Sequence, residues 1–537
     1  MHGGKIASTL TGRHRRAHST TSNVSSIDGN AGEVEDDTTV VEPEQGNVLM
    51  HIISQLRPGA DLSRVVLPTF ILEPRSMLER ITNFMCHPEM LLYIPDLDDP
   101  IQRFVSVVKF YLSGWHIRPP GVKKPLNPIL GEIYTCYWNL PDGKRAYYIS
   151  EQTSHHPPKS SYFYVAPHHH IRIDGTLKPR SRFLGNSAAS LMEGIAVLTL
   201  TNRGADPKKG ERYYLTQPNM YARGILFGNM KYELGDHSVV RCPELGLTAD
   251  IEFKTKGWVG GTYNAIGGVI RNDAGQTLFE LSGLWSEEMF IKDVRVQMFF
   301  NALKERPSKP QVRPLEEQDE RESVRLWHKT AQAVKENNHQ VATEEKTKIE
   351  DRQREEAARR AADGVEWHPR LFRRVRGGPG GPEEGLEDLE WVINHKVDGL
   401  TPEKITEQVM NIYPIVPGQK VSERNFIPPR AHASRPSTAG GPAAEDKKAD
   451  LIDFSASEPA AAPALVPAPS TGEKEVSTML QATGKGAEEG PLIDFASDME
   501  KDLPPSNQQA PQQPQNVPTV KRSETDVSND AFFDAHE

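Results

Sequence analysis

The spacing of hydrophobic positions changes twice along this chain of 537 residues. In the early stretch "NVLMHIISQL" the apolar residues recur with the spacing of one helical face until "RPG" ends the pattern; they are Val48, Leu49, Ile52, Ile53 and Leu56. From about residue 120 to 300, short runs rich in β-branched and aromatic residues, such as "EIYTCYW", "SYFYVA" and "GIAVLTL", alternate with Gly, Pro, Asn and Asp turns. Many short strands at this spacing indicate a β-barrel or a β-sandwich.

Helical spacing returns after about residue 320. One apolar face is shared by Val324, Trp327, Ala331 and Val334. A highly charged helix follows, for which Thr343 is the expected N-cap and Gly364 the expected end. The chain is therefore predicted to be α+β, with helices gathered at both ends of a sheet domain.

Composition limits how much of the chain can fold. With 42 Pro, 41 Gly and only 37% hydrophobic residues, it is too dilute for a core that runs from end to end. We expect a disordered segment over residues 1–45 and a mostly disordered tail over 377–537. Short helices at 386–412 interrupt that expected tail, because Thr401 before Pro402 is a favourable helix start.

Charge and cysteine usage restrict the function. The formal net charge of -10 argues against non-specific nucleic-acid binding, so an anionic partner must meet a local basic cluster. The three cysteines, Cys86, Cys136 and Cys242, are far apart and form no CxxC pair, which fits a reducing compartment and excludes a thiolate zinc site. Since no apolar run approaches about 18 residues and no secretory signal is present, we expect a cytoplasmic protein.

The stretch "EQTSHHPPKS", residues 151–160, carries the most distinctive chemistry. Its adjacent histidines suit a metal site, a catalytic base or an anion cradle. A metal is disfavoured, because neighbouring residues of an extended chain point to opposite faces and Pro157 keeps His156 extended. With no GxSxG, P-loop or HExxH motif, we expect no enzyme activity and no cofactor.

Two further segments bring cations. "KKPLNPILGE", residues 123–132, offers Lys123, Lys124 and Asn127 at a proline-flanked turn. In "EEKTKIEDRQREEAARR", Lys346, Glu350 and Arg354 fall on one helical face at i, i+4 and i+8. By itself that face is better explained as a solvated set of salt bridges.

Together the three segments resemble the oxysterol-binding-protein-related family of lipid carriers over about residues 46–376, with Thr153 where Val is commoner. The resemblance implies a nearly closed antiparallel β-barrel around a lipid tunnel, an N-terminal lid at about 46–75 and a C-terminal helical subdomain. It also implies that Glu350 orients its two cationic neighbours. The residues implied to bind the headgroup of phosphatidylinositol 4-phosphate are Lys124, Asn127, His155, His156, Lys346 and Arg354.

The lid stretch and "RSRFLGNS", residues 180–187, resemble the phosphatidylserine-carrying subgroup. This implies that Leu67 contacts acyl chains, and that Ser181 binds the serine headgroup with Lys124 and Asn127. The implied function is non-vesicular exchange of phosphatidylserine for phosphatidylinositol 4-phosphate, by a peripheral protein at contacts between the endoplasmic reticulum and the plasma membrane. The alternatives are a sterol/phosphatidylinositol 4-phosphate exchanger and a phosphoinositide-sensing scaffold without transport.

The C-terminal "AFFDAHE", residues 531–537, resembles the FFAT motif that docks on VAP-type receptors of the endoplasmic reticulum, although Ala531 replaces the usual acid. Phe532 and Phe533 would fill apolar pockets, while Asp534 and Glu537 steer toward a basic surface. "LIDF" occurs at 451–454 and at 492–495, as an unknown adaptor motif or without function.

Overall fold

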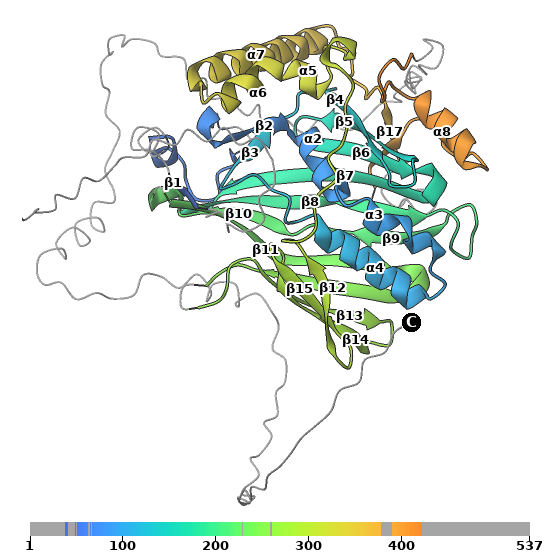
Figure 1. The fold of residues 1–537 in the computed structure, drawn as a ribbon. Coiled ribbons are helices and arrows are strands. Elements are labelled where there is room, and N and C mark those ends of the chain that lie inside the picture. Colours follow the sequence, from blue (N-terminus) through green and yellow to red (C-terminus); the bar gives the residue numbers. More distant parts are fainter. Residues whose placement is uncertain are drawn as a thin grey trace, which may run out of the picture. The chain divides into compact units, whose positions relative to one another are not determined.

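A computed structural model describes residues 38–40, 49, 51–62, 65, 67–227, 229–257, 260–376 and 389–420 (Figure 1). All of them belong to the first of two units of the chain, residues 1–435. Residues 38–40, within the segment expected to be disordered, form a short strand. The rest of that segment and residues 421–537 lie outside the described residues, and with them the FFAT-like motif with Phe532, Phe533, Asp534 and Glu537 and both "LIDF" copies.

One 14-stranded antiparallel sheet dominates the fold. Its main path runs β16-β15-β14-β13-β12-β11-β10-β8-β7-β6-β5-β4, with β1 paired to β11 and β9 paired to β8 and β11. The strands are β1 (Thr38–Val40), β4 (Ile133–Asn139), β5 (Arg145–Ser154), β6 (Lys159–Ala166), β7 (Ile171–Phe183), β8 (Ser187–Leu200), β9 (Glu211–Leu215), β10 (Asn219–Arg223), β11 (Asn229–Cys242), β12 (Leu247–Lys254), β13 (Ala265–Asn272), β14 (Thr277–Leu284), β15 (Glu288–Lys292) and β16 (Val296–Asn301).

The sheet curls so that the segment after β16 covers the outer edge of β4. Tyr137 and Gln311 exchange backbone hydrogen bonds of 2.9 and 2.8 Å, and the indole N–H of Trp138 donates to the Ser308 carbonyl at 3.0 Å. An antiparallel sheet with a covered edge is the expected nearly closed barrel, since an uncovered edge would leave backbone groups without partners.

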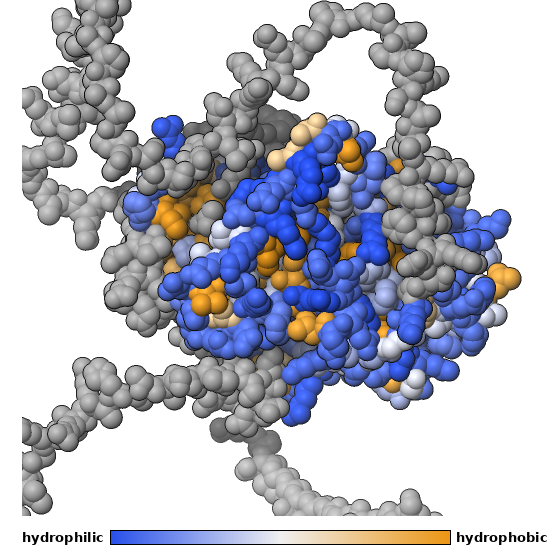
Figure 2. All heavy atoms as spheres, turned by 90° about the horizontal axis from the view of Figure 1, so that it is seen from above, coloured by the Kyte–Doolittle hydropathy of each residue, from blue (hydrophilic) through white to orange (hydrophobic). Residues whose placement is uncertain are grey.

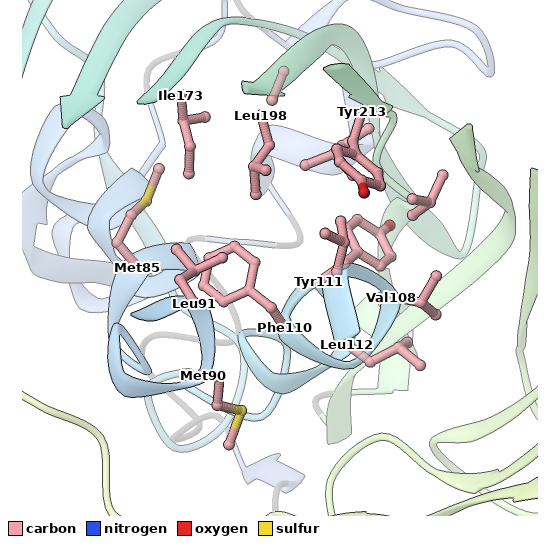
Figure 3. Close-up of a cluster of buried hydrophobic side chains, with 14 of the residues drawn as sticks. Met85, Met90, Leu91, Val108, Phe110, Tyr111, Leu112, Ile173, Leu198 and Tyr213 are labelled. Atoms are coloured by element: carbon pink, nitrogen blue, oxygen red, sulfur yellow. The ribbon is translucent and has the colours of Figure 1, made fainter. Parts of the chain in front are cut away.

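Short helices before the barrel pack into its interior. The longest, α4 (Pro100–Ser113), begins with Asp99, whose carboxylate accepts a hydrogen bond from the Ile101 N–H at 2.8 Å. Figure 3 shows Phe110 and Tyr111 of this helix opposite strand residues that include Ile173, Leu198 and Tyr213. The other helices here are α2 (Met77–Arg80), α3 (Glu89–Leu92) and the 3-10 turns η2 (Thr69–Ile71), η3 (Ile81–Met85) and η4 (Ile94–Asp96).

Three helices follow the barrel: α5 (Ser323–Leu326), α6 (His328–Lys335) and α7 (His339–Ala362). They lie together on one side of the molecule (Figure 1), where α6 contacts β2 (Leu72–Ser76), the partner of β3 (Lys124–Leu126). The predicted N-cap of α7 was wrong: Asn338 accepts from the Val341 N–H at 3.2 Å, whereas Thr343 donates back to the His339 carbonyl. The predicted end is confirmed, since Gly364 adopts a φ of 64° beyond the last turn.

The folded chain continues past residue 376, the boundary expected from the glycine-rich stretch. β17 (Phe372–Arg374) pairs with β18 (Trp391–Ile393), and α8 (Pro402–Met410) begins at the predicted cap Thr401. Strands β4, β5 and β6 are buried on both faces, because this C-terminal segment covers their outer face. The covering cluster includes Trp391, Ile393, Val409, Tyr413 and Ile415, packed on Tyr147, Phe163 and Val165.

The expected class, α+β with a large antiparallel sheet and helices toward both ends of the chain, is confirmed. In the part of the chain that the structure describes, no helix combines the length and apolar character needed to cross a bilayer.

Candidate ligand-binding site

An apolar cavity of about 210 Å³ lies between the N-terminal segment and the sheet. A single buried water needs roughly 10–15 Å³ by this measure, so the cavity is far larger than a packing defect. The N-terminal segment lines it with Leu49, Ile52, Ile53, Leu56, Leu62, Leu67 and Ile71. The sheet lines it with residues that include Leu177, Ala189, Met192, Met220 and Met230.

The N-terminal segment is fixed over the cavity by the end of β7. The Gly59 N–H donates to the Phe183 carbonyl at 2.6 Å, and the Phe183 N–H donates to the Ala60 carbonyl at 2.9 Å. Leu49, Ile53 and Leu62 are buried in the same cluster as Phe183. These few contacts form a cover that closes the cavity without being part of the barrel.

Phe70 and Ile71, at the end of this cover, have separate places. Ile71 lines the cavity, whereas the ring of Phe70 meets that of His339 at the start of α7, with 6.2 Å between ring centroids. The Phe70 carbonyl also accepts from the Lys123 ammonium group at 2.7 Å. Lys123 therefore holds the end of the cover.

Three of the four residues expected to contact phosphatidylserine line this cavity: Leu67, Lys124 and Ser181. Asn127 does not; its side chain is exposed beyond the end of β3. Burial lowers the pKa of Lys124, and the charge of Lys346 lowers it further, against the opposing effect of Asp61. Two ammonium groups from β3 and α7 are therefore close enough to repel each other beside the cavity.

His155 joins the three segments that the sequence singled out. One of its ring nitrogens, Nδ1, lies 3.2 Å from the Pro128 carbonyl, and the other, Nε2, lies 2.8 Å from Gln353 Nε2. The Gln353 carbonyl oxygen accepts from the Leu130 N–H at 2.8 Å, so its NH₂ group faces the imidazole. His155 is therefore neutral with the proton on Nδ1, and burial lowers its pKa to about 4.

The other predicted cations are more accessible. His156 is exposed, with its ring centroid 4.5 Å from that of His155. The Lys346 ammonium group pairs with Glu350 at 2.6 Å. Arg354, 59% exposed, pairs instead with Asp351. Glu350 thus orients Lys346, but its expected role toward Arg354 is not seen, because the carboxylate three residues before Arg354 takes that place.

Sequence reasoning missed two buried polar residues that build this site. Gln353, adjacent to Arg354 on α7, carries the contacts that fix His155. Glu132 accepts hydrogen bonds from the Ile129 N–H at 3.0 Å, the Ser323 hydroxyl at 2.6 Å and the Trp327 indole at 2.9 Å. It thereby ties the 123–132 segment to α5. The only sequence signal for Glu132 was an acidic residue directly after Gly131, at the end of the proline-flanked turn.

The resulting arrangement can bind an anion next to an apolar chain. Lys124, Lys346, Arg354 and His156 supply charged or polar donors within a chain of net negative charge. Lys124 also belongs to the lining of the covered cavity, so the polar and apolar parts are continuous. A molecule with an anionic head and an apolar body matches both parts.

Comparisons with known proteins identify the family of the chain. The family model described as oxysterol-binding protein matches residues 51–339 and 329–398. Oxysterol-binding protein homolog 6 of Saccharomyces cerevisiae is 49% identical over 436 residues, covering 79% of this chain and 95% of that protein. Homolog 7 of the same yeast is 50% identical over 390 residues, covering 71% and 87%.

Solved structures share the fold. The Osh1 ORD domain in complex with cholesterol aligns with a TM-score of 0.55 at 22% identity, covering 70% of this chain and 93% of that chain. The Osh3 ORD in complex with PI(4)P, from Saccharomyces cerevisiae, aligns with a TM-score of 0.50 at 20% identity, covering 70% and 95%. The chain therefore belongs to the oxysterol-binding protein family of lipid-binding and lipid-transfer proteins.

Proposed function

We propose that this protein exchanges phosphatidylserine for phosphatidylinositol 4-phosphate between the endoplasmic reticulum and the plasma membrane, one lipid at a time. The observation that carries the proposal is the lining of the covered cavity. Leu67, Lys124 and Ser181 line this one cavity, whose walls are otherwise mostly apolar. The positive charge of Lys346 is near enough to lower the pKa of Lys124. One cavity thus meets both lipids at the same cation, which makes them competitors.

The phosphoinositide headgroup suits the cationic cluster. A monoester and a diester phosphate carry about three negative charges near neutral pH. Lys124, Lys346 and Arg354 provide three positive charges, and the exposed His156 lies next to His155. An anion here relieves the repulsion between the two ammonium groups and favours protonation of the imidazoles, whose N–H groups then become donors.

The cover is needed because exposure of acyl chains to water is energetically costly. Transfer of a diacyl lipid with roughly thirty methylenes into water would cost about 25 kcal/mol, at about 0.8 kcal/mol per methylene. The apolar lining of the cavity keeps water away from such chains, and so does the cover formed by the described residues of 49–71. Leu67 in the cover contacts the acyl chains in this proposal, as expected from the sequence.

For phosphatidylserine, Ser181 and Lys124 supply a hydroxyl and an ammonium group inside the cavity. Asn127 contributes from the rim, since its side chain is exposed. No covalent chemistry is part of the mechanism, so the protein acts as a carrier and not as an enzyme. Residues 531–537 hold it at the endoplasmic reticulum through a VAP-type receptor, leaving the carrier domain to reach the plasma membrane.

The test is mass spectrometry of lipid that purifies with the full chain. We expect one phosphatidylserine or one phosphatidylinositol 4-phosphate per protein, each displacing the other when liposomes containing the second lipid are added. A bound sterol would replace phosphatidylserine in the proposal by a sterol. A protein that binds phosphoinositide liposomes but extracts no lipid would be a scaffold, and the exchange mechanism would be refuted.

A further inference from the structure

A second hollow, of about 530 Å³, lies beside the last turns of α7. Arginines from three separate segments line it: Arg321 before α5, Arg359 and Arg360 in α7, and Arg370 after α7. We call it the arginine pocket. It shares no lining residue with the apolar cavity. The face of the molecule on the side of α5–α7 is mainly hydrophilic, with only scattered apolar residues (Figure 2).

The wall of the arginine pocket is rigid on one side. Trp367 lies over Gly131, where a Cβ would stand 3.3 Å from the indole ring. Gly131 has a φ of 74°, a left-handed conformation that glycine adopts at low cost. The backbone and the aromatic ring therefore meet closely and form a fixed wall beside the arginines.

Two of the carboxylates in the pocket, Glu151 and Glu356, are already engaged. The two oxygens of Glu151 accept from the backbone N–H groups of Arg370 and Leu371, each at 2.7 Å. Burial raises the pKa of Glu151 to about 7, which removes part of its negative charge at neutral pH. Glu356 pairs with Arg321.

The remaining positive charge lies on α7. Arg370 pairs with the exposed Asp319 at 3.3 Å and lies over the Tyr413 ring. Neither Arg359 nor Arg360 forms an ion pair with another residue of the described chain, and Asp363 is the one further carboxylate in the lining. The pocket therefore has more guanidinium groups than neighbouring carboxylates neutralise.

Guanidinium groups that converge from several segments suit phosphate, because each presents two parallel N–H groups to two oxygens. The volume admits a ligand larger than a single ion. We propose that the arginine pocket is a second anion site and that it binds a molecule with more than one phosphate group. It is distinct from the headgroup cluster, which consists of Lys124, Lys346, Arg354 and His156. A soluble polyphosphate and a polyphosphorylated lipid headgroup share this chemistry.

The pocket is connected to His155 through Leu130 and Gln353. Arg321 donates to the Leu130 carbonyl at 2.8 Å, while the Leu130 N–H donates to Gln353, which contacts His155. An anion that draws Arg321 away from Leu130 acts on the backbone that positions the imidazole. Occupancy of the arginine pocket should therefore change affinity at the headgroup cluster, and the effect must be reciprocal.

Pyrophosphate binding to the full chain, measured by calorimetry at fixed salt, tests the proposal. The double variant Arg359→Gln with Arg360→Gln should bind pyrophosphate at least tenfold more weakly. Arg352→Gln is the matched control, because Arg352 is exposed on the same helix and lines neither site. Glutamine is a good helix former, so thermal unfolding of both variants should match that of the parent protein.

The same titration with Lys346→Ala separates this proposal from the proposed function. Pyrophosphate binding that persists in Lys346→Ala and is lost in the double variant supports a second site, whatever the result of the lipid experiment. Equal binding by the double variant and the parent protein, or complete loss in Lys346→Ala alone, would overturn it.

Vesicles distinguish the two sources of the ligand. Phosphatidylcholine vesicles with and without phosphatidylinositol 4,5-bisphosphate are floated with the double variant in the Lys346→Ala background. Loss of capture together with loss of pyrophosphate binding assigns the site to a lipid headgroup. Loss of pyrophosphate binding alone assigns it to a soluble polyphosphate.

Discussion

Gln353→Ala is the sharpest test of how the headgroup cluster is built. Gln353 is only 9% exposed and holds two partners at 2.8 Å, the Leu130 N–H and the His155 imidazole. Each hydrogen bond contributes about 1 kcal/mol net, and a buried partner left unsatisfied costs about 1–3 kcal/mol. Allowing for water at one of the two positions, the variant should lose about 2–4 kcal/mol in free energy of unfolding.

The measurement is urea unfolding of Gln353→Ala against Gln340→Ala. Gln340 lies on the same helix, is exposed, and contacts only Glu344 at 3.1 Å among the described residues, so its loss should change stability by less than about 0.5 kcal/mol. A second readout is the NMR titration of His155, whose pKa should rise because its Nε2 no longer accepts a hydrogen bond. Equal stability of the two variants, with an unchanged His155 titration, would refute the assigned role of Gln353.

Three other predictions follow from the same residues. Because the pKa of His155 falls from 6.5 to about 4 on folding, the unfolded chain binds more protons in that window and stability decreases as pH falls through it; His155→Gln should reduce the slope by up to about 1.4 kcal/mol per pH unit in urea titrations. An unchanged slope would contradict the assignment. His155→Ala with His156→Ala should reduce phosphatidylinositol 4-phosphate extraction from liposomes at least tenfold, whereas Lys348→Ala, 66% exposed on α7, should not. Normal extraction by the double variant would remove both histidines from the site. Deletion of residues 531–537 should release the protein from the endoplasmic reticulum in cells, and retained localisation would exclude docking through Phe532 and Phe533.

Local patterns were sufficient to predict most of the fold. The strand runs were recognisable because turn residues separate them, and Thr401 before Pro402 marked the start of α8. The cap of α7 was misplaced because Asn338 and Thr343 both fit the local preference. The helix begins at Asn338, and Thr343 lies inside it, where its hydroxyl donates to the His339 carbonyl.

The site was predictable only in its charged residues. "KKPLNPILGE", the paired histidines and the Lys346 helix stood out, and the structure joins all three through His155. Gln353 and Glu132 did not, because a buried polar residue is recognised by partners that are distant in sequence, such as Ser323 and Trp327 for Glu132. The arginine pocket has the same origin, since Arg321 and Arg360 meet only in three dimensions.

The C-terminal segment that packs on the outer face of β4, β5 and β6 has a consequence for synthesis on the ribosome. These strands have no solvent-exposed face, yet roughly 250 residues separate Phe163 from Ile415, which shields it. At about 5–20 residues per second, translation leaves this apolar face exposed to solvent for roughly 12–50 s. During this interval a chaperone or another apolar surface must shield the face in place of the C-terminal segment. Docking of that segment is therefore the step that completes folding.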